Sequence, residues 1–149
     1  MRRTGAGIAT LRGQEVLLIR RGDNGLWDIP GGGKGFWESP ERAACRELGE
    51  ETGLTVGAVQ PLSIFRHTHT YPDGNVVDWT THVFTAEYAG GETRAAGDAA
   101  QVRWWPLDAL PGEISTATGK YFAALRGSGV SRRPPTPAHA APSAPSAGR

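Results

Sequence analysis

The first apolar feature of the chain is an unbroken run of four aliphatic side chains within the segment Glu15 to Arg20. A run this short and continuous is typical of a strand that is buried on both faces. The preceding segment, Thr4 to Arg12, is rich in glycine and alanine with Ile8 and Leu11, and it also predicts a strand. A turn around Gly13 joins the two, so the chain is expected to begin with two strands.

Two longer segments in the second half carry the β-branched and aromatic residues that favour strands. They run from Val59 to Tyr71 and from Val76 to Tyr88, with a typical turn sequence at Pro72-Asp73-Gly74-Asn75 between them. We therefore expect the second segment to fold back and pair with the first. A further short strand is predicted at Gln101 to Trp105.

A helix with well-marked ends is predicted from Pro40 to Thr52. Ser39 can cap its first turn, proline suits the first helical position, and Glu41 lies at the positive end of the helix dipole. Gly53 is a natural C-terminal stop. A second helix is expected from Ser115 to Leu125. The order of strands, helix, strands and helix predicts an α/β protein whose helices pack on a mixed sheet.

The last segment, Gly127 to Arg149, holds proline, alanine, serine, glycine and arginine but almost no large apolar side chain. Such a composition cannot bury enough surface to fold, so we expect one domain over residues 1–126 and a disordered tail over 127–149. The whole chain carries a net charge of +1, and removing the tail leaves 13 basic and 15 acidic residues. Neither charge suggests nucleic acid as an obligatory partner.

The compartment is predicted from what the sequence does not contain. The only cysteine, Cys45, cannot form an intramolecular disulfide. The N-terminus does not resemble a signal peptide, and no apolar run is long enough to cross a bilayer. We therefore expect a soluble protein that works in the cytoplasm without a membrane partner.

The chemistry of the chain is concentrated in the helix Pro40 to Thr52. Glu47, Glu50 and Glu51 are spaced by three and four residues, which places their carboxylates on one helical face. No lysine on that face relieves their repulsion, so the arrangement is destabilising unless a cation occupies it. Oxygen ligands favour a hard divalent ion, and Mg²⁺ or Mn²⁺ is the usual choice beside phosphates.

A glycine-rich segment immediately before this helix provides the second half of the predicted site. Gly31, Gly32, Gly33 and Gly35 let the backbone turn sharply and approach a ligand closely. We expect a loop in which backbone amides of Gly31 and Gly32, with Lys34 nearby, bind phosphate oxygens. Because loop and helix are consecutive, both can line one pocket.

The spacing of these residues resembles the Nudix box, G-x5-E-x7-R-E-U-x-E-E-x-G-U, in which U is a bulky aliphatic residue. Gly32 is followed after five residues by Glu38, and after seven more by the segment Arg46 to Leu54, so every fixed position is matched. The segment Trp27 to Gly31 is similar to the W-x-L-P-G lead-in of many members. The resemblance covers roughly Thr4 to Leu125.

This resemblance implies a Nudix-type α/β/α sandwich with a central mixed β-sheet. It implies metal binding and catalysis by Glu47, Glu50 and Glu51, with Mg²⁺ as cofactor and Mn²⁺ as a substitute. It also implies that Glu38 and Arg46 hold the loop against the helix. By the same comparison, Gly32 and Gly53 are positions that fix the backbone shape.

Some positions depart from the family pattern or leave alternatives open. Gly35 and Trp37 stand where many members have glutamate and glycine, and Trp37 could reshape the mouth of the pocket. A further catalytic carboxylate outside the box is expected at Asp98, with Glu113 as a competitor. His67 and His69 share a strand face, but this spacing alone favours solvated or substrate-facing side chains over zinc ligands.

The predicted function is that of a MutT-like enzyme, a metal-dependent pyrophosphohydrolase of nucleoside di- or triphosphates or their derivatives. The alternative within the enzymes is an ADP-ribose or nucleotide-sugar pyrophosphatase. An alternative from another class is a Nudix-fold module that senses a nucleotide without hydrolysing it. Many relatives pair through their sheets, which leaves a homodimer open for this chain.

Overall fold

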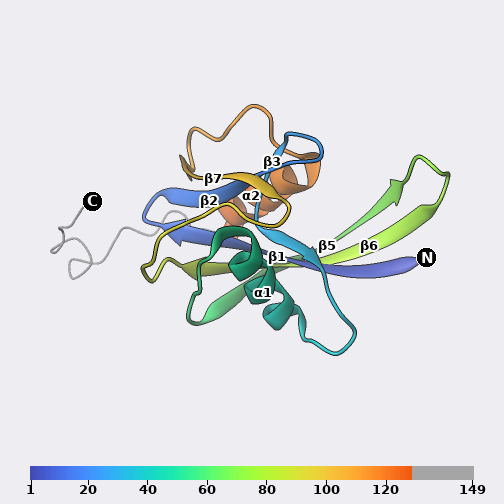
Figure 1. The fold of residues 1–149 in the computed structure, drawn as a ribbon, viewed down its shortest axis with the longest axis horizontal. Helices are drawn as coiled ribbons and strands as arrows, with labels where there is room; N and C mark the ends of the chain where they lie inside the picture. The colour runs from blue at the N-terminus through green and yellow to red at the C-terminus, as the bar shows by residue number, and fades with distance from the viewer. Residues whose placement is uncertain (129–149) are drawn as a thin grey trace, which may run out of the picture.

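The computed structural model describes residues 1–128 of the 149-residue chain. Within this range it contains seven strands and two helices (Figure 1). In chain order these are β1 (Arg2–Arg12), β2 (Glu15–Arg21), β3 (Trp27–Asp28), β4 (Gly31–Gly33), α1 (Pro40–Thr52), β5 (Val59–Thr70), β6 (Val76–Glu87), β7 (Ala99–Pro106) and α2 (Thr116–Ser128).

All seven strands belong to one mixed sheet. Its main order is β3-β2-β1-β6-β5, with β4 paired to β1 and β7 paired to β2. Strands β1 and β6 run parallel over the register Arg2–Asp78 to Leu11–Glu87, and every other pair is antiparallel. The predicted mixed sheet is therefore confirmed, as is the predicted pairing of the two long strands β5 and β6.

The two helices cover opposite faces of the sheet, and each face has its own apolar core. Helix α1 contributes Leu48 to the core that contains Ile8 and Leu17, whereas α2 contributes Phe122 and Leu125 to the other core. Successive side chains of β2 enter the two cores alternately, which explains the continuous apolar run in this strand. The hairpin of β5 and β6 extends beyond both helices, beside the N-terminus (Figure 1).

Helix α1 begins and ends at the predicted residues. The Ser39 hydroxyl accepts a hydrogen bond from the Arg42 amide at 3.2 Å, which caps the first turn. Gly53 ends the helix in the left-handed region at φ 79°, and its amide donates to the Gly49 carbonyl. Only glycine adopts this conformation readily, so the stop is fixed by the sequence.

The structure differs from the sequence prediction in the glycine-rich segment, where the expected loop is partly a strand. Gly31, Gly32 and Gly33 form β4 and pair with Gly7, Ala6 and Gly5 of β1. A glycine run has no side-chain alternation that would indicate a strand, and its partner lies far away in the sequence. The backbone of these three glycines is therefore held in the sheet at the point where a sharply turning loop was expected.

The second helix is shifted relative to its prediction. It begins at Thr116 because Ser115 acts as its cap, with the Ser115 hydroxyl accepting a hydrogen bond from the Thr118 amide at 3.1 Å. It continues through Gly127 and Ser128. The rest of the predicted tail, residues 129–149, lies outside the described residues. Neither α1 nor α2 is long and apolar enough to span a membrane, and these are the only helices of the described range.

We predict that Leu48→Ala destabilises the protein by about 2–5 kcal/mol, the range found when a buried leucine is truncated and leaves a cavity. Leu48 is fully buried between α1 and the sheet. Denaturant unfolding of the purified variant measures the change, with Arg42→Ala on the exposed side of the same helix as the control. A loss below about 1 kcal/mol would contradict the packing described for this core.

Candidate active site

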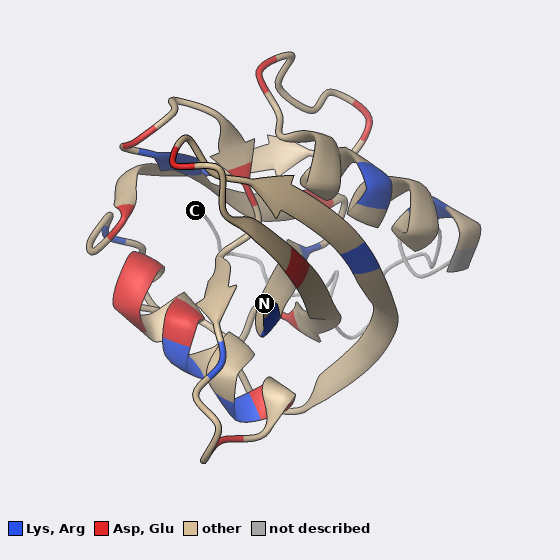
Figure 2. Ribbon diagram, turned by 90° about the vertical axis from the view of Figure 1, so that its right-hand side faces the viewer, with Lys and Arg blue, Asp and Glu red and all other residues tan. Residues whose placement is uncertain are grey.

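The three glutamates of α1 differ strongly in their exposure to solvent. The Glu51 residue is only 2% exposed, the Glu47 side chain is 14% exposed, and the Glu50 side chain is 55% exposed. Acidic residues lie along this helix beside basic ones (Figure 2). The helix thus presents a gradient from a buried carboxylate to a solvated one.

The carboxylate of Glu51 is held by strand β4. Its Oε1 accepts a hydrogen bond from the Gly31 amide at 3.0 Å. Burial raises the pKa of Glu51 to about 7, an effect that the Gly31 hydrogen bond opposes and the charge of Glu47 reinforces. In the metal-free protein this group therefore exchanges a proton near neutral pH.

Glu47 lies directly against the backbone of Gly32. A Cβ atom at position 32 would stand 2.4 Å from the Glu47 Oε2, so only glycine allows this approach. Burial raises the pKa of Glu47, Arg46 opposes this shift, and Glu50 adds to it. Gly31 thus binds the carboxylate of Glu51, and Gly32 leaves room for the carboxylate of Glu47.

Arg46 connects the helix to the segment that precedes it. Its Nη2 donates to the Glu38 Oε1 at 2.7 Å and to the Gly33 carbonyl at 3.1 Å. The hydrogen bond from Arg46, helped by one from the Gly35 amide, lowers the pKa of Glu38 to about 2. Glu38 therefore stays ionised, and the ion pair holds the glycine-rich segment against α1.

The same guanidinium also reaches Glu47 and Glu50. The Nη1 of Arg46 lies 3.2 Å from both carboxylate oxygens of Glu50 and 3.4 Å from the Glu47 Oε2. The sequence has no lysine on this helix face that would relieve the repulsion among the glutamates. The structure shows that Arg46 relieves part of this repulsion. The acidic face is thus not left without a counter-charge.

The residues fit a hard divalent cation by their chemistry. Glu47, Glu50 and Glu51 offer only oxygen donors, and the buried pair carries elevated pKa values that a cation would relieve. In the present arrangement no three acidic, histidine or cysteine side chains of residues 1–128 converge closely enough to hold a metal ion. In this arrangement the Glu51 carboxylate is bound by the Gly31 amide and the Glu50 carboxylate by Arg46.

The structure separates the two candidates for an additional carboxylate. Asp98 lies close enough to Glu47 and Glu51 for its charge to raise the pKa of each. It also lines an open hollow of about 350 Å³ next to the Asp23 loop. Glu113 is 72% exposed and pairs instead with Arg20, at 3.6 Å. The geometry therefore favours Asp98 as the neighbour of the buried glutamates.

The groups expected to bind phosphate already have partners within the protein. The Gly31 amide donates to Glu51, and Gly32 pairs with Ala6 in the sheet. The Lys34 Nζ donates to the carbonyl oxygens of Gly35 and Glu38 at 3.0 and 3.1 Å. A phosphate contact of these three groups stays a prediction, and their contribution in this structure is to hold the segment in shape.

One neighbour of the site was not found by sequence reasoning. A Cβ atom built on Gly5 would lie 3.3 Å from the Gly32 carbonyl oxygen, 3.4 Å from the Thr81 hydroxyl and 3.5 Å from the Trp79 ring. Trp79 is half-buried and lies on the sheet face opposite α1. Sequence analysis gave no signal for it, because the contact depends on the parallel pairing of β1 with β6.

Comparison with known proteins places this geometry in a family. The model of the NUDIX domain matches residues 1–125. A MutT-like protein from Streptomyces ambofaciens is 31% identical, over 79% of this chain and 70% of that protein. The crystal structure of a MutT NUDIX hydrolase from Burkholderia pseudomallei superposes with a TM-score of 0.75 at 31% identity, covering 84% of this chain and 98% of that one. The chain belongs to the NUDIX domain family.

Family membership confirms the fold and the enzyme class that the motif predicts, a Nudix hydrolase with an α/β/α sandwich. An ADP-ribose pyrophosphatase from Methanocaldococcus jannaschii is 34% identical over 65% of this chain. The chain spans 57% of the length of that relative, which is less than two thirds. The named activities of the relatives therefore describe those proteins, and the substrate of this chain is a separate question.

We predict that Gly32→Ala lowers catalytic turnover by about a hundredfold, the effect of misplacing a reacting group by roughly 1 Å. The new Cβ would displace the flexible end of Glu47 while leaving the fold intact. Steady-state kinetics and a thermal melt measure the two effects. Gly33→Ala is the matched control, because a Cβ there meets no atom within 4 Å. Equal activity of the two variants would contradict the role assigned to Gly32.

We also predict that the metal-free protein becomes less stable as the pH rises from about 4.5 to about 7. Folding raises the pKa of Glu51 from 4.5 to about 7, so across this interval the unfolded state has lost the proton that the folded state keeps. The free energy of unfolding should then level off above pH 7. Denaturant titrations in a chelator measure this slope, and Glu51→Gln should make it shallower. A slope unchanged in the variant would show that Glu51 ionises normally.

Proposed function

We propose that the chain is a divalent-metal-dependent pyrophosphohydrolase that cleaves the diphosphate bond of nucleoside di- or triphosphates or their derivatives. The observation that carries this proposal is the buried carboxylate of Glu51, held by the Gly31 amide beside Glu47 and Gly32. A carboxylate in this environment, with a pKa near 7, is matched to proton transfer and to cation binding rather than to solvation. The relatives named as hydrolases and pyrophosphatases support the same reaction class.

Glu47, Glu50 and Glu51 would hold the cation, with Mg²⁺ as the expected ion and Mn²⁺ as a substitute. Such an ion, when bound, neutralises phosphate charge and acidifies water. Glu50 is the exposed member and is bound only to Arg46 among the contacts described for residues 1–128. It is therefore the carboxylate that can be released for a ligand with the least change in the buried part of the site.

The chain's own residues then prepare the hydrolysis. The attacking water forms a new P–O bond, its proton passes to a carboxylate, and the bridging P–O bond of the diphosphate breaks. Glu47 and Glu51 are the acceptors that the geometry supports, because burial raises the pKa of both toward neutral pH. Asp98 is a third carboxylate whose charge acts on the same pair. Arg46 and Glu38 keep the glycine segment in register with α1.

The nucleoside end of the substrate is assigned to the sheet face beyond Gly32. Trp79 offers an indole ring for stacking, and the Thr81 hydroxyl offers a polar contact beside it. Both lie within 3.5 Å of the Cβ position of Gly5, which is 3.3 Å from the Gly32 carbonyl oxygen, and Glu47 lies against Gly32. A diphosphate at the carboxylates would then have its nucleoside within reach of this face.

Two other functions are kept as alternatives. Hydrolysis of ADP-ribose or a nucleotide sugar is favoured by the relative named as an ADP-ribose pyrophosphatase. A sensor that binds a nucleotide without turnover is disfavoured by the buried Glu51, since binding alone does not require a destabilised carboxylate. A cytoplasmic location and a small-molecule nucleotide as ligand complete the proposal, and a homodimer stays open.

We predict metal-dependent turnover that Glu51→Gln reduces by about a hundredfold to ten-thousandfold, the usual contribution of a proton-transfer group. The assay follows phosphate or monophosphate release with Mg²⁺ or Mn²⁺. Its substrates are canonical and oxidised nucleoside triphosphates, nucleoside diphosphates, ADP-ribose, nucleotide sugars and dinucleoside polyphosphates. Glu41→Gln on the same helix is the matched control. Nucleotide binding without turnover by the folded wild type would favour the sensor.

A further inference from the structure

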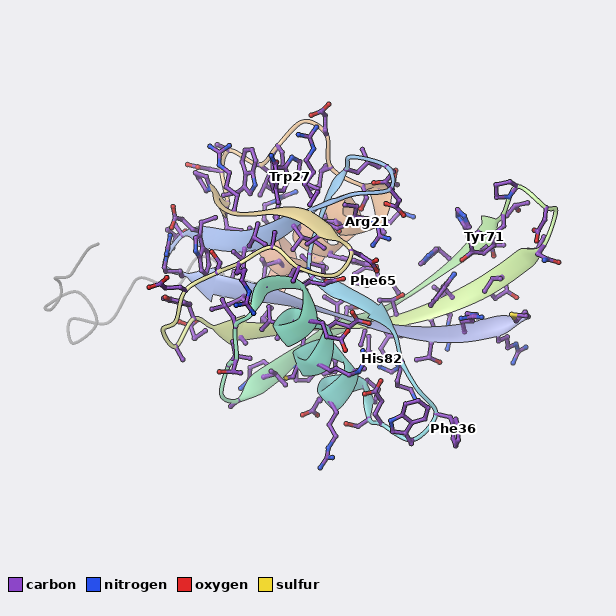
Figure 3. The ribbon with its side chains drawn as sticks, in the orientation of Figure 1. Arg21, Trp27, Phe36, Phe65, Tyr71 and His82 are labelled. Carbon is purple, nitrogen blue, oxygen red and sulfur yellow. The ribbon has the colours of Figure 1, made fainter. Side chains whose placement is uncertain are left out.

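Two large aromatic side chains stand almost free of the protein at the tip of the segment between β4 and α1. Phe36 is 93% exposed and Trp37 is 77% exposed. Figure 3 shows Phe36 at the outer end of this segment, next to α1 and away from the sheet. Leaving two such rings in water forgoes the stabilisation that burial gives them, so an exposed aromatic pair marks a contact surface.

The backbone beneath the two rings is held in a turn by several hydrogen bonds. The Gly35 amide donates to the Glu38 Oε1 at 2.9 Å, and the Glu38 amide donates to the Gly35 carbonyl at 3.2 Å. The Lys34 Nζ closes the same turn from the other side through the carbonyl oxygens of Gly35 and Glu38. The aromatic pair is therefore presented on a tight turn, which lowers the entropy lost when a ligand binds.

The rings also support each other. Their centroids lie 5.3 Å apart in an edge-to-face arrangement, with an angle of 84° between the planes. The Trp37 indole lies over Gly35, where a Cβ would stand 2.7 Å from the ring. The glycine thus allows one face of the indole to rest on the backbone. A flat ring held in this way is suited to stacking.

This turn is a direct continuation of the active site. Gly33 and Glu38 on either side of it are both bound by Arg46, which also contacts Glu50. From Gly33, the three residues to Phe36 can span at most roughly 10 Å. The aromatic pair is thus tied to the carboxylates through one side chain and one short segment.

We infer that Phe36 and Trp37 form a stacking platform for a second nucleobase of the substrate. This inference rests on the proposed function, since it assigns a place to a further group of the same substrate. Trp79 lies on the sheet face opposite α1, whereas Phe36 lies next to α1 and away from the sheet (Figure 3), so a substrate with two bases fits this arrangement better than a mononucleotide. Base stacking on aromatic rings accepts any base.

The test compares substrates with one and two bases. The probes are ATP, diadenosine tetraphosphate and a 5′-triphosphorylated dinucleotide, assayed with wild type, Phe36→Ala, Trp37→Ala and Trp37→Phe. We expect Trp37→Ala to raise the KM for two-base probes by about five- to a hundredfold, the range for loss of one base–aromatic stack. The kcat and all constants for ATP should stay within about twofold, and Trp37→Phe should retain most of the affinity. Comparison of the two-base probes distinguishes a dinucleoside polyphosphate from an RNA end.

Tyr71→Ala is the matched control, because Tyr71 is an exposed aromatic on the distant β5–β6 hairpin (Figure 3). An unchanged KM for both two-base probes would overturn the inference. So would an equal loss for ATP, which would indicate a distorted loop. A wild-type dimer that Trp37→Ala converts to a monomer, with unchanged KM, would assign the pair to a second copy of the chain.

The inference also has a readout that does not need turnover. Stacking on Trp37 should quench its fluorescence, so diadenosine tetraphosphate should quench wild type more than Trp37→Phe. If the wild type hydrolyses none of these three probes, the quenching still decides the inference, and the full substrate panel described above decides the proposed function. Equal quenching of the two proteins would overturn the inference even where hydrolysis is observed.

Discussion

The hydrogen bond from the Gly31 amide to the Glu51 carboxylate is the interaction on which the rest of the site depends. It connects strand β4 to helix α1 and gives a buried carboxylate its partner. A charged group that is 2% exposed is strongly disfavoured unless it is bound or neutralised. The hydrogen bond from the Gly31 amide stabilises the ionised carboxylate in part, but the elevated pKa of Glu51 shows that burial still disfavours its charge. A bound cation or a proton would relieve this effect of burial, which makes the position suitable for either.

Arg46 provides positive charge beside the glutamates of the site, on its solvent-exposed side. Its bond to Glu38 is 2.7 Å long, whereas its contacts with Glu50 and Glu47 are 3.2 and 3.4 Å long. The guanidinium can therefore release the two α1 glutamates while keeping Glu38 and the Gly33 carbonyl. One arginine thus combines a permanent structural contact with a replaceable one, which fits a site that must accept and lose a charged ligand.

Sequence predicts the parts of this site that depend on local chemistry. Helix α1 was predicted to the residue because Ser39, Pro40 and Gly53 determine its ends through their own backbone preferences. Strand β4 was not predicted, since a run of glycines carries no alternation and its partner is remote. Trp79 was missed for the same reason: its neighbours come from parallel pairing. The metal ligands Glu47, Glu50 and Glu51 were predicted from their spacing on one helix face and from the family motif, and Asp98 from the resemblance alone.

The positions of strand β4 and of Trp79 in β6 depend on pairing with strand β1, which is remote from both in sequence. Its C-terminal residues pair with β2, through Leu11 and Val16, while its N-terminal part pairs with β4 along the same edge. This change of partner from β2 to β4 is possible because glycines in β1 and β4 let these two strands lie close together. A Cβ at Gly31 would lie 2.5 Å from the Ala6 carbonyl oxygen, and one at Gly7 would lie 2.9 Å from Ile29. A side chain at Gly31 would meet the backbone of Ala6 and Gly7, push β4 away from β1 and take the Gly31 amide away from Glu51. The active site therefore depends on residues 5–7 of β1 as directly as on the motif that identifies it.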